Sequence, residues 1–255
     1  MELDGGWVRG AIIGAGAQGT VSLAMNSSNG QLFAVKSAAS YSSELDNEYE
    51  ILQPLDSPYI VRCLGRNFSV EHGVEMHNLL MEYMPGGSLG DLLIKFGGRL
   101  NESMIRSYTD AILCGIHYLH RQGIVHCDIK GKNVLVGTNG VKLADFGSAK
   151  RFAGNEKCQK TLQLRGTPLW MAPEVVKQVE QGPASDIWSL GCTVLEMATG
   201  RPPWNNVSNP VAAIYQIGRT EELPKLPALI SAQLQDFLEK CFREIQRRYG
   251  AVHSF

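Results

Sequence analysis

The fold is decided by residues 126–133, His-Cys-Asp-Ile-Lys-Gly-Lys-Asn, together with the later segments Asp145-Phe146-Gly147 and Ala172-Pro173-Glu174. One short stretch thus supplies a carboxylate, an ammonium and an amide from Asp128, Lys130 and Asn133. Taken singly, Asp128 could cap a loop and Asp145 could sit in a turn. The occurrence of all three segments in this order favours a functional site over three separate turns.

A glycine-rich stretch, Gly14-Ala15-Gly16-Ala17-Gln18-Gly19-Thr20-Val21, lies upstream and fits the pattern G-x-G-x-x-G-x-V. Missing side chains let backbone amides approach phosphate oxygens closely. Alone, the pattern also fits a hairpin without a ligand, or a dinucleotide-binding fold. A dinucleotide fold needs a helix directly after the glycines, whereas Val21, Leu23 and Met25 alternate with other residues and predict a strand.

Lys36 ends the apolar run Phe33-Ala34-Val35, which predicts the returning strand after a tight turn at Asn29-Gly30. A lysine on a strand is usually a solvated charge. Here Glu48, in a predicted helix, offers a carboxylate that could pair with it. Glu50 is the alternative partner, but we expect it on the solvated face of that helix.

The periodicity of apolar residues changes after the first hundred residues. From Asn101 onward they recur at helical spacing, with Asn101 as a predicted N-cap and Gly123 as the stop. Residues 186–199 predict a buried helix closed by Gly200, and residues 134–136 and 141–143 predict a hairpin around Asn139-Gly140. A small β-rich lobe is therefore expected before a larger helical one, which is an α+β architecture.

Composition excludes several classes of protein. With 44% hydrophobic residues and a net charge of −1, the chain can form a large core and has no global attraction for nucleic acid. Its six cysteines show no C-x-x-C pair, as expected of reduced thiols. No signal peptide or membrane span is predicted. We expect an intracellular protein, located in the cytoplasm or the nucleus.

The ordered segments resemble the protein kinase family, and the resemblance covers nearly the whole chain. It implies a bilobal protein kinase fold in a single domain, residues 1–255. The N-lobe and hinge would span about residues 1–84, and the C-lobe about residues 85–255. It also implies ATP and Mg²⁺ as cofactors and a protein as the phosphate acceptor.

The resemblance implies a role for each polar residue of the site. Asp128 would accept the proton of the substrate hydroxyl, and Asn133 and Asp145 would bind the magnesium ions. Lys130 would neutralise charge on the transferred phosphoryl group. A lysine at this position is typical of serine/threonine kinases, as is Thr167, which would hydrogen-bond Asp128 and Lys130.

The resemblance also implies an ATP pocket. Lys36, paired with Glu48, would contact the α- and β-phosphates, Met81 would lie behind the adenine, and the backbone of Glu82-Tyr83-Met84 would bind its edge. Apolar side chains would sandwich the ring, although an ordinary core could explain them too. Ser88 and Asp91 are candidates for ribose or substrate contacts. The remaining nucleotide-binding residues would be Ile13, Gly14, Gly16, Gly19, Val21, Ala34 and Leu135.

Within the family, residues 166–176, G-T-P-L-W-M-A-P-E-V-V, and residues 184–204 resemble MAP kinase kinase kinases, and H-C-D-I-K-G resembles the plant branch. This resemblance implies that the substrate is a serine or threonine in the activation loop of a MAP kinase kinase. It further implies a monomeric catalytic domain. Two alternatives stay open: a pseudokinase scaffold that binds signalling partners, and an immune-type kinase that also lacks the family's H-R-D arginine.

The sequence departs from the family pattern at two places. Cys127 replaces the H-R-D arginine, so we expect activation-loop phosphorylation, at Thr161, Thr167 or another hydroxyl, to matter less than usual. Residues 243–248 only loosely resemble the family's D-P-x-x-R element, with Ile245 in place of proline, and we expect the closing helix to be truncated. Asp186 should tie the buried helix to the catalytic loop, and Glu174 should pair with an arginine, for which Arg248 is the candidate.

Overall fold

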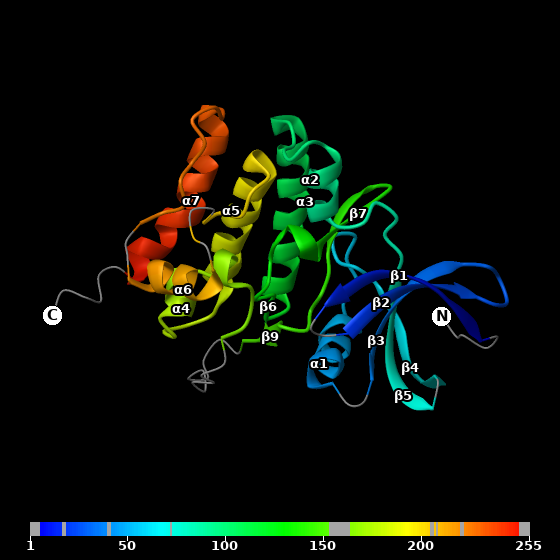
Figure 1. Ribbon diagram of the computed structural model, residues 1–255. Coiled ribbons are helices and arrows are strands. Elements are labelled where there is room, and N and C mark those ends of the chain that lie inside the picture. Colours follow the sequence, from blue (N-terminus) through cyan, green and yellow to red (C-terminus); the bar gives the residue numbers. More distant parts are fainter. Residues whose placement is uncertain are drawn as a thin grey trace.

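A computed structural model gives the fold of the chain. It describes residues 6–16, 19–39, 42–71, 73–152, 164–204, 207, 209–219 and 222–249, with side chains described up to residue 242. Figure 1 shows a sheet at one end of the molecule and most of the helices at the other. The α+β, two-lobed architecture expected from the sequence is confirmed.

The N-lobe is one antiparallel sheet with strand order β1-β2-β3-β5-β4. Its strands are β1 (Trp7–Gly16), β2 (Gly19–Asn26), β3 (Leu32–Ala39), β4 (Cys63–Glu71) and β5 (Val74–Glu82), and helix α1 (Ser43–Leu52) follows β3. In Figure 1, α1 lies beside the sheet, on the side that faces the helical lobe. The predicted turn joins β2 to β3, with Gly30 at a positive φ of 70°, which glycine adopts readily.

The two-residue period of the strands separates the faces of this sheet. Ala34 and Lys36 of β3 pair with Leu23 and Val21 of β2, so these side chains share one face. Phe33 and Val35 point the other way and are fully buried in a second cluster. Lys36 therefore belongs to the face that the helical lobe approaches.

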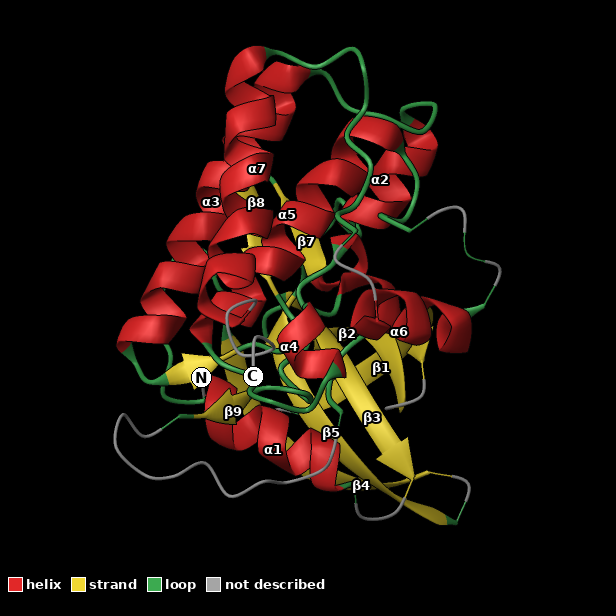
Figure 2. Ribbon diagram, turned by 90° about the vertical axis from the view of Figure 1, so that its left-hand side faces the viewer, coloured by secondary structure: helices red, strands yellow, loops and turns green. Residues whose placement is uncertain are grey.

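The C-lobe is mainly helical (Figure 2). Among the described residues, two pairs of short strands and two short helical turns lie between its longer helices. Its elements are α2 (Leu89–Lys95), α3 (Glu102–Arg121), β6 (Ile124–Val125), η1 (Gly131–Asn133), β7 (Val134–Gly137), β8 (Gly140–Leu143), β9 (Lys150–Arg151), η2 (Pro168–Trp170), α4 (Pro173–Val176), α5 (Pro183–Thr199), α6 (Pro210–Arg219) and α7 (Ala232–Tyr249). The predicted hairpin is β7 with β8, paired in register from Val134 and Leu143.

Helix ends follow the predicted capping residues in most cases. The Asn101 side chain accepts a hydrogen bond from the Met104 N–H at the start of α3, and Gly200 ends α5 in the left-handed conformation. Helix α5 begins at Pro183, three residues before the predicted start. At the C-terminus α7 continues to Tyr249, past Ile245, because isoleucine keeps the N–H that the family's proline lacks.

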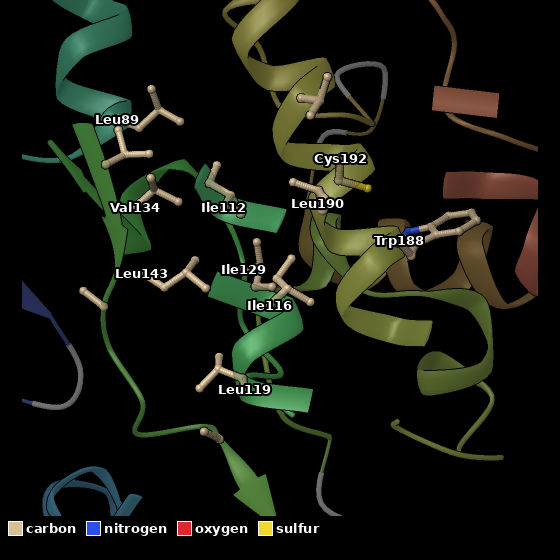
Figure 3. Close-up of a cluster of buried hydrophobic side chains, with 14 of the residues drawn as sticks. Leu89, Ile112, Ile116, Leu119, Ile129, Val134, Leu143, Trp188, Leu190 and Cys192 are labelled. Atoms are coloured by element: carbon tan, nitrogen blue, oxygen red, sulfur yellow. The ribbon is translucent and has the colours of Figure 1, made fainter. Parts of the chain in front are cut away.

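The main core lies between α2, α3, α5 and the β7–β8 hairpin. Figure 3 shows apolar side chains from these elements in contact, including Ile112 and Ile116 of α3, Leu143 of β8 and Leu190 of α5. Trp188 of α5 packs edge-on against Phe242 of α7, with ring centroids 4.9 Å apart. Within the described ranges, no helix is both long and apolar enough to cross a membrane.

Candidate active site

The loop between β6 and β7 holds Asp128 in a network of its near neighbours in sequence. Its Oδ2 accepts hydrogen bonds from Lys130 Nζ at 2.7 Å and from Asn133 Nδ2 at 2.9 Å. Asn133 Nδ2 also lies 2.8 Å from the Asp128 carbonyl oxygen. The Asp128 side chain is only 10% exposed, so these bonds fix its orientation in a site shielded from water.

Thr167 completes this network, as expected from the sequence. Its hydroxyl donates to Asp128 Oδ1 at 2.6 Å and accepts from Lys130 Nζ at 2.6 Å. Gly166 allows this approach, because a Cβ there would stand 2.3 Å from the Cys127 carbonyl oxygen. A phosphate on Thr167 would face the Asp128 carboxylate and remove the hydroxyl that donates to it, so this geometry disfavours Thr167 among the candidate hydroxyls of the activation loop.

Asp186, at the start of α5, binds the backbone of the loop that carries Asp128. Its carboxylate accepts hydrogen bonds from the backbone N–H groups of His126 and Cys127, at 2.9 and 3.0 Å, and contacts His120 Nε2 at 2.9 Å. Cys127 has a positive φ of 67°, a conformation that costs a non-glycine residue about 1 kcal/mol or more. The predicted tie between the buried helix and the catalytic loop is confirmed.

Lys36 lies between two carboxylates. Its Nζ is 2.6 Å from Glu48 Oε2 on α1 and 2.8 Å from Asp145 Oδ1. Glu48 Oε1 also accepts the backbone N–H of Phe146 at 3.1 Å. The predicted pairing of Lys36 with Glu48 is confirmed, and Glu50 is exposed on the other face of the helix.

The charges of Lys36 and Asp145 stabilise each other, whereas burial raises the pKa of Glu48 above its ordinary value. Burial disfavours the charged form of Lys36, but the negative charges of Glu48 and Asp145 raise the pKa of the lysine above its ordinary value. Burial also disfavours the charged form of Asp145, yet the Lys36 cation holds the pKa of this carboxyl below its ordinary value. Both groups are therefore ionised at neutral pH.

The residues expected to bind metal fit a hard divalent cation that also binds phosphate oxygens. Asp145 is ionised and about one-third exposed, and Asn133 has its amide nitrogen turned toward Asp128. The two are close in space because the Ala144 N–H donates to the Asn133 carbonyl oxygen at 2.9 Å. One carboxylate and one amide oxygen are a typical protein contribution to a Mg²⁺ site that phosphates and water complete.

The residues expected around the nucleotide come from four elements. Ile13 and the three glycines lie on β1 and β2, Ala34 on β3 and Leu135 on β7. Gly19 is required by the fold, because a Cβ there would lie 2.3 Å from the Ser37 carbonyl oxygen. A Cβ at Gly16 would meet nothing within 4 Å, which leaves open space beside its backbone. Contacts of this set with ATP stay predictions.

The segment between the lobes is fixed by side-chain contacts. Glu82 Oε1 accepts hydrogen bonds from the Arg62 N–H at 2.7 Å and from Lys142 Nζ at 2.6 Å, which ties this segment to β8. Met81 and Met84 are buried. Ser88 and Asp91 form a capping box at the start of α2, with Ser88 Oγ 2.6 Å from Asp91 Oδ2. Helix capping is thus a sufficient reason for these two residues, and their ligand contacts stay predictions.

Two expectations concern residues beyond the described part. Glu174 Oε1 accepts a hydrogen bond from Ser185 Oγ at 2.8 Å, and its buried Oε2 has no hydrogen-bond partner among the described residues. The side chain of Arg248, its predicted partner, lies outside the described residues, as does Thr161.

Two polar residues near the site were not predicted from the sequence. Glu196, on α5, accepts the Gly131 N–H at 3.1 Å; burial raises its pKa, and this hydrogen bond opposes the rise. Asn47, next to Glu48 on α1, contacts three backbone carbonyl oxygens of residues 146–149. Glu196 is the one charged residue in the mostly apolar run of residues 187–198, which was a signal for it, whereas no local pattern marks Asn47.

Comparisons with known proteins agree with this arrangement. The sequence pattern of the protein kinase domain matches residues 7–254. Mitogen-activated protein kinase kinase kinase 17 of Arabidopsis thaliana is 44% identical over 253 residues, which cover 96% of this chain and 67% of that protein. Mitogen-activated protein kinase kinase kinase 20 of the same plant is 45% identical, over 98% of this chain and 78% of that protein. Kinase kinase kinase A of Dictyostelium discoideum is 42% identical over 93% of this chain, which spans only 26% of that protein.

Proposed function

The chain belongs to the protein kinase family, whose members transfer a phosphoryl group from ATP to protein hydroxyls, and we propose that it acts as a MAP kinase kinase kinase. Its substrates would be serine or threonine residues in the activation loop of a MAP kinase kinase, with Mg²⁺ as the divalent cation. The observation that carries the serine/threonine assignment is the triangle of Asp128, Lys130 and Thr167, with all three contacts at 2.6–2.7 Å. The printed names of the relatives support the choice of substrate.

In the proposed mechanism, Asp128 positions the substrate hydroxyl and accepts its proton as the new P–O bond forms. Asn133 and Thr167 keep the carboxylate in one orientation, so little reorganisation is needed during transfer. Lys130 stabilises the negative charge of the transferred group from the same side. Catalysis thus depends on orientation and charge, without a covalent intermediate.

Lys36 would hold the α- and β-phosphates, and Glu48 would fix the direction of its ammonium group. Asn133 and Asp145 would bind the Mg²⁺, which neutralises phosphate charge when bound. Lys36 already contacts Asp145 across the two lobes. Nucleotide phosphates would therefore enter a site whose charged groups are in place.

The two alternatives explain the structure less well. A pseudokinase scaffold needs none of this charge arrangement, yet each of Lys36, Glu48, Asp128 and Asn133 has a partner within 2.9 Å. An immune-type kinase shares the missing arginine at Cys127. The relatives found here, however, are named as MAP kinase kinase kinases.

The substrate assignment is tested with a panel of catalytically inactive MAP kinase kinases. Each is incubated with the protein, ATP and Mg²⁺, and the phosphorylated residues are mapped by mass spectrometry. We expect serine or threonine in the activation loop of at least one member to be labelled, and Asp128→Asn enzyme to label none. Labelling of only an unrelated protein would overturn the substrate and leave the kinase activity in place.

A further inference from the structure

Asn47 is placed where helix α1 meets the segment that follows Asp145. Its Nδ2 lies 3.4 Å from the carbonyl oxygen of Phe146, 3.1 Å from that of Gly147 and 3.0 Å from that of Ala149. These acceptors are about 100 residues away in sequence. A single amide with two N–H groups thus serves three backbone acceptors from another part of the chain.

The position of Asn47 in the helix makes these contacts relevant to phosphoryl transfer. The next residue is Glu48, which holds Lys36 and accepts the Phe146 N–H. Any outward movement of α1 that separates Glu48 from Lys36 must also break the contacts of Asn47. The two residues bind the same short segment. Glu48 accepts a hydrogen bond from the backbone N–H of the segment, and Asn47 donates to the backbone carbonyl groups of the segment.

A second side chain, that of Arg165, also binds this segment. Arg165 Nη1 lies 3.4 Å from the carbonyl oxygen of Ser148 and 3.2 Å from that of Ala149. The carbonyl groups of residues 146–149 are therefore all contacted by Asn47 or Arg165. Cys127, by contrast, is buried and uncharged, so the catalytic loop contributes no cation at its position.

We propose that Asn47 is a positioning residue for the transfer reaction: it fixes α1 to the Asp145-Phe146-Gly147 segment through backbone carbonyl groups and so holds Glu48 against Lys36. The contact needs no phosphate and no ligand, since both partners belong to this chain. Asn47 acts through Glu48 and touches neither substrate nor nucleotide. The inference rests on the proposed phosphoryl transfer but not on the proposed substrate.

Three variants test the inference. Asn47→Asp keeps the size of the side chain but places an acceptor against three acceptors, and Asn47→Ala removes the contacts. Glu50→Gln, on the exposed face of the same helix, is the matched control. We expect kcat/KM for ATP to fall about 10-fold in the Ala variant, which corresponds to about 1.4 kcal/mol, further in the Asp variant, and less than about twofold in the control.

A background that already lacks the ion pair separates positioning from a general loss of stability. In Glu48→Gln enzyme, Asn47→Ala should lower kcat/KM by less than about twofold, because there is no longer an ion pair to hold. Hydrogen exchange is compared between Asn47→Ala and the wild type, both without substrate. The variant should exchange faster in α1 and in residues 146–149, and at an unchanged rate in α3.

The outcomes are separable. Equal kcat/KM in the wild type and both Asn47 variants would overturn the inference, as would a full 10-fold loss in the Glu48→Gln background. Activity is measured on a generic acceptor protein as well as on inactive MAP kinase kinases. The test of Asn47 therefore remains valid if MAP kinase kinases prove not to be substrates. The hydrogen-exchange measurement tests the inference without any measurement of activity.

Discussion

Two parts of the active site are built in different ways. The Asp128 network uses partners 2, 5 and 39 residues away, all within the helical lobe. The Lys36 site joins β3, α1 and the segment after β8, with partners 12 and 109 residues away in both lobes. The first part is complete within one lobe, whereas the second exists only when the lobes and α1 are correctly placed.

This difference assigns separate tasks to the two parts. A network closed within one lobe suits a group that must keep one orientation during the reaction. A site assembled from three elements can be opened by movement of any one of them, so it suits control of activity. A change of Asp128 itself should therefore affect the chemical step alone, and changes at the Lys36 site should affect nucleotide affinity as well.

Replacement of Asp128 tests the first half of the comparison and should have the largest effect. Asp128→Asn should lower kcat about 1,000- to 10,000-fold, because the amide cannot accept the proton. The dissociation constant for ATP should change little, since the residue faces the acceptor hydroxyl. The measurement pairs kcat with nucleotide titration. A variant that lost ATP affinity and kept its rate at saturating substrate would show that the base is another residue.

Replacement of Lys36 tests the second half. Lys36→Met should lower kcat/KM for ATP about 100- to 1,000-fold, because a positioned cation at the phosphates is lost. It also leaves Glu48 and Asp145 without their shared cation, so stability should fall by about 3 kcal/mol. Thermal unfolding and steady-state kinetics measure the two effects. Unchanged ATP kinetics would move the phosphate anchor elsewhere.

Cys127 precedes Asp128 in the catalytic loop, and its replacement by arginine should have a moderate effect. Lys150 and Arg165 are already close enough to act on the Cys127 thiol, so a third cation would repel them until a phosphate binds. Phosphatase-treated Cys127→Arg enzyme should lose about 10-fold in rate and regain it on phosphorylation, while the treated wild type keeps most of its rate. A wild type that falls silent on dephosphorylation and recovers on rephosphorylation would contradict this account.

Cysteine alkylation gives the smallest and most local test. Burial strongly raises the pKa of the Cys127 thiol, and burial, with a contribution from Glu48, raises the pKa of the half-buried Cys63. Cys114 is exposed. Among these three thiols, iodoacetamide at pH 8 should therefore react with the native protein first at Cys114, more slowly at Cys63 and last at Cys127. Peptide mass spectrometry over time gives the order, and early labelling of Cys127 would show that the catalytic loop opens.

The same difference explains how far the sequence could be interpreted. Asp128, Lys130 and Asn133 are contiguous enough to form a pattern, and the capping of α3 by Asn101 is a local property of the chain. The choice of Glu48 over Glu50 was also correct. Asn47 and Glu196 escaped prediction because their partners are backbone groups of distant segments. A backbone N–H or carbonyl group carries no mark in the sequence, so only the folded arrangement shows which side chain it will bond.

The hydrogen bonds from His126 and Cys127 to Asp186 also impose an order on biosynthesis. Asp186 is 60 residues downstream of His126, so at ribosomal speeds it is added roughly 3 to 12 s later. By then the whole β1–β5 sheet, Lys36 and Glu48 have been synthesised. A nascent chain can thus complete its sheet while the loop that carries Asp128 has no acceptor for two of its backbone N–H groups. A nascent chain that is still attached to the ribosome therefore cannot transfer phosphate before α5 has emerged from the exit tunnel.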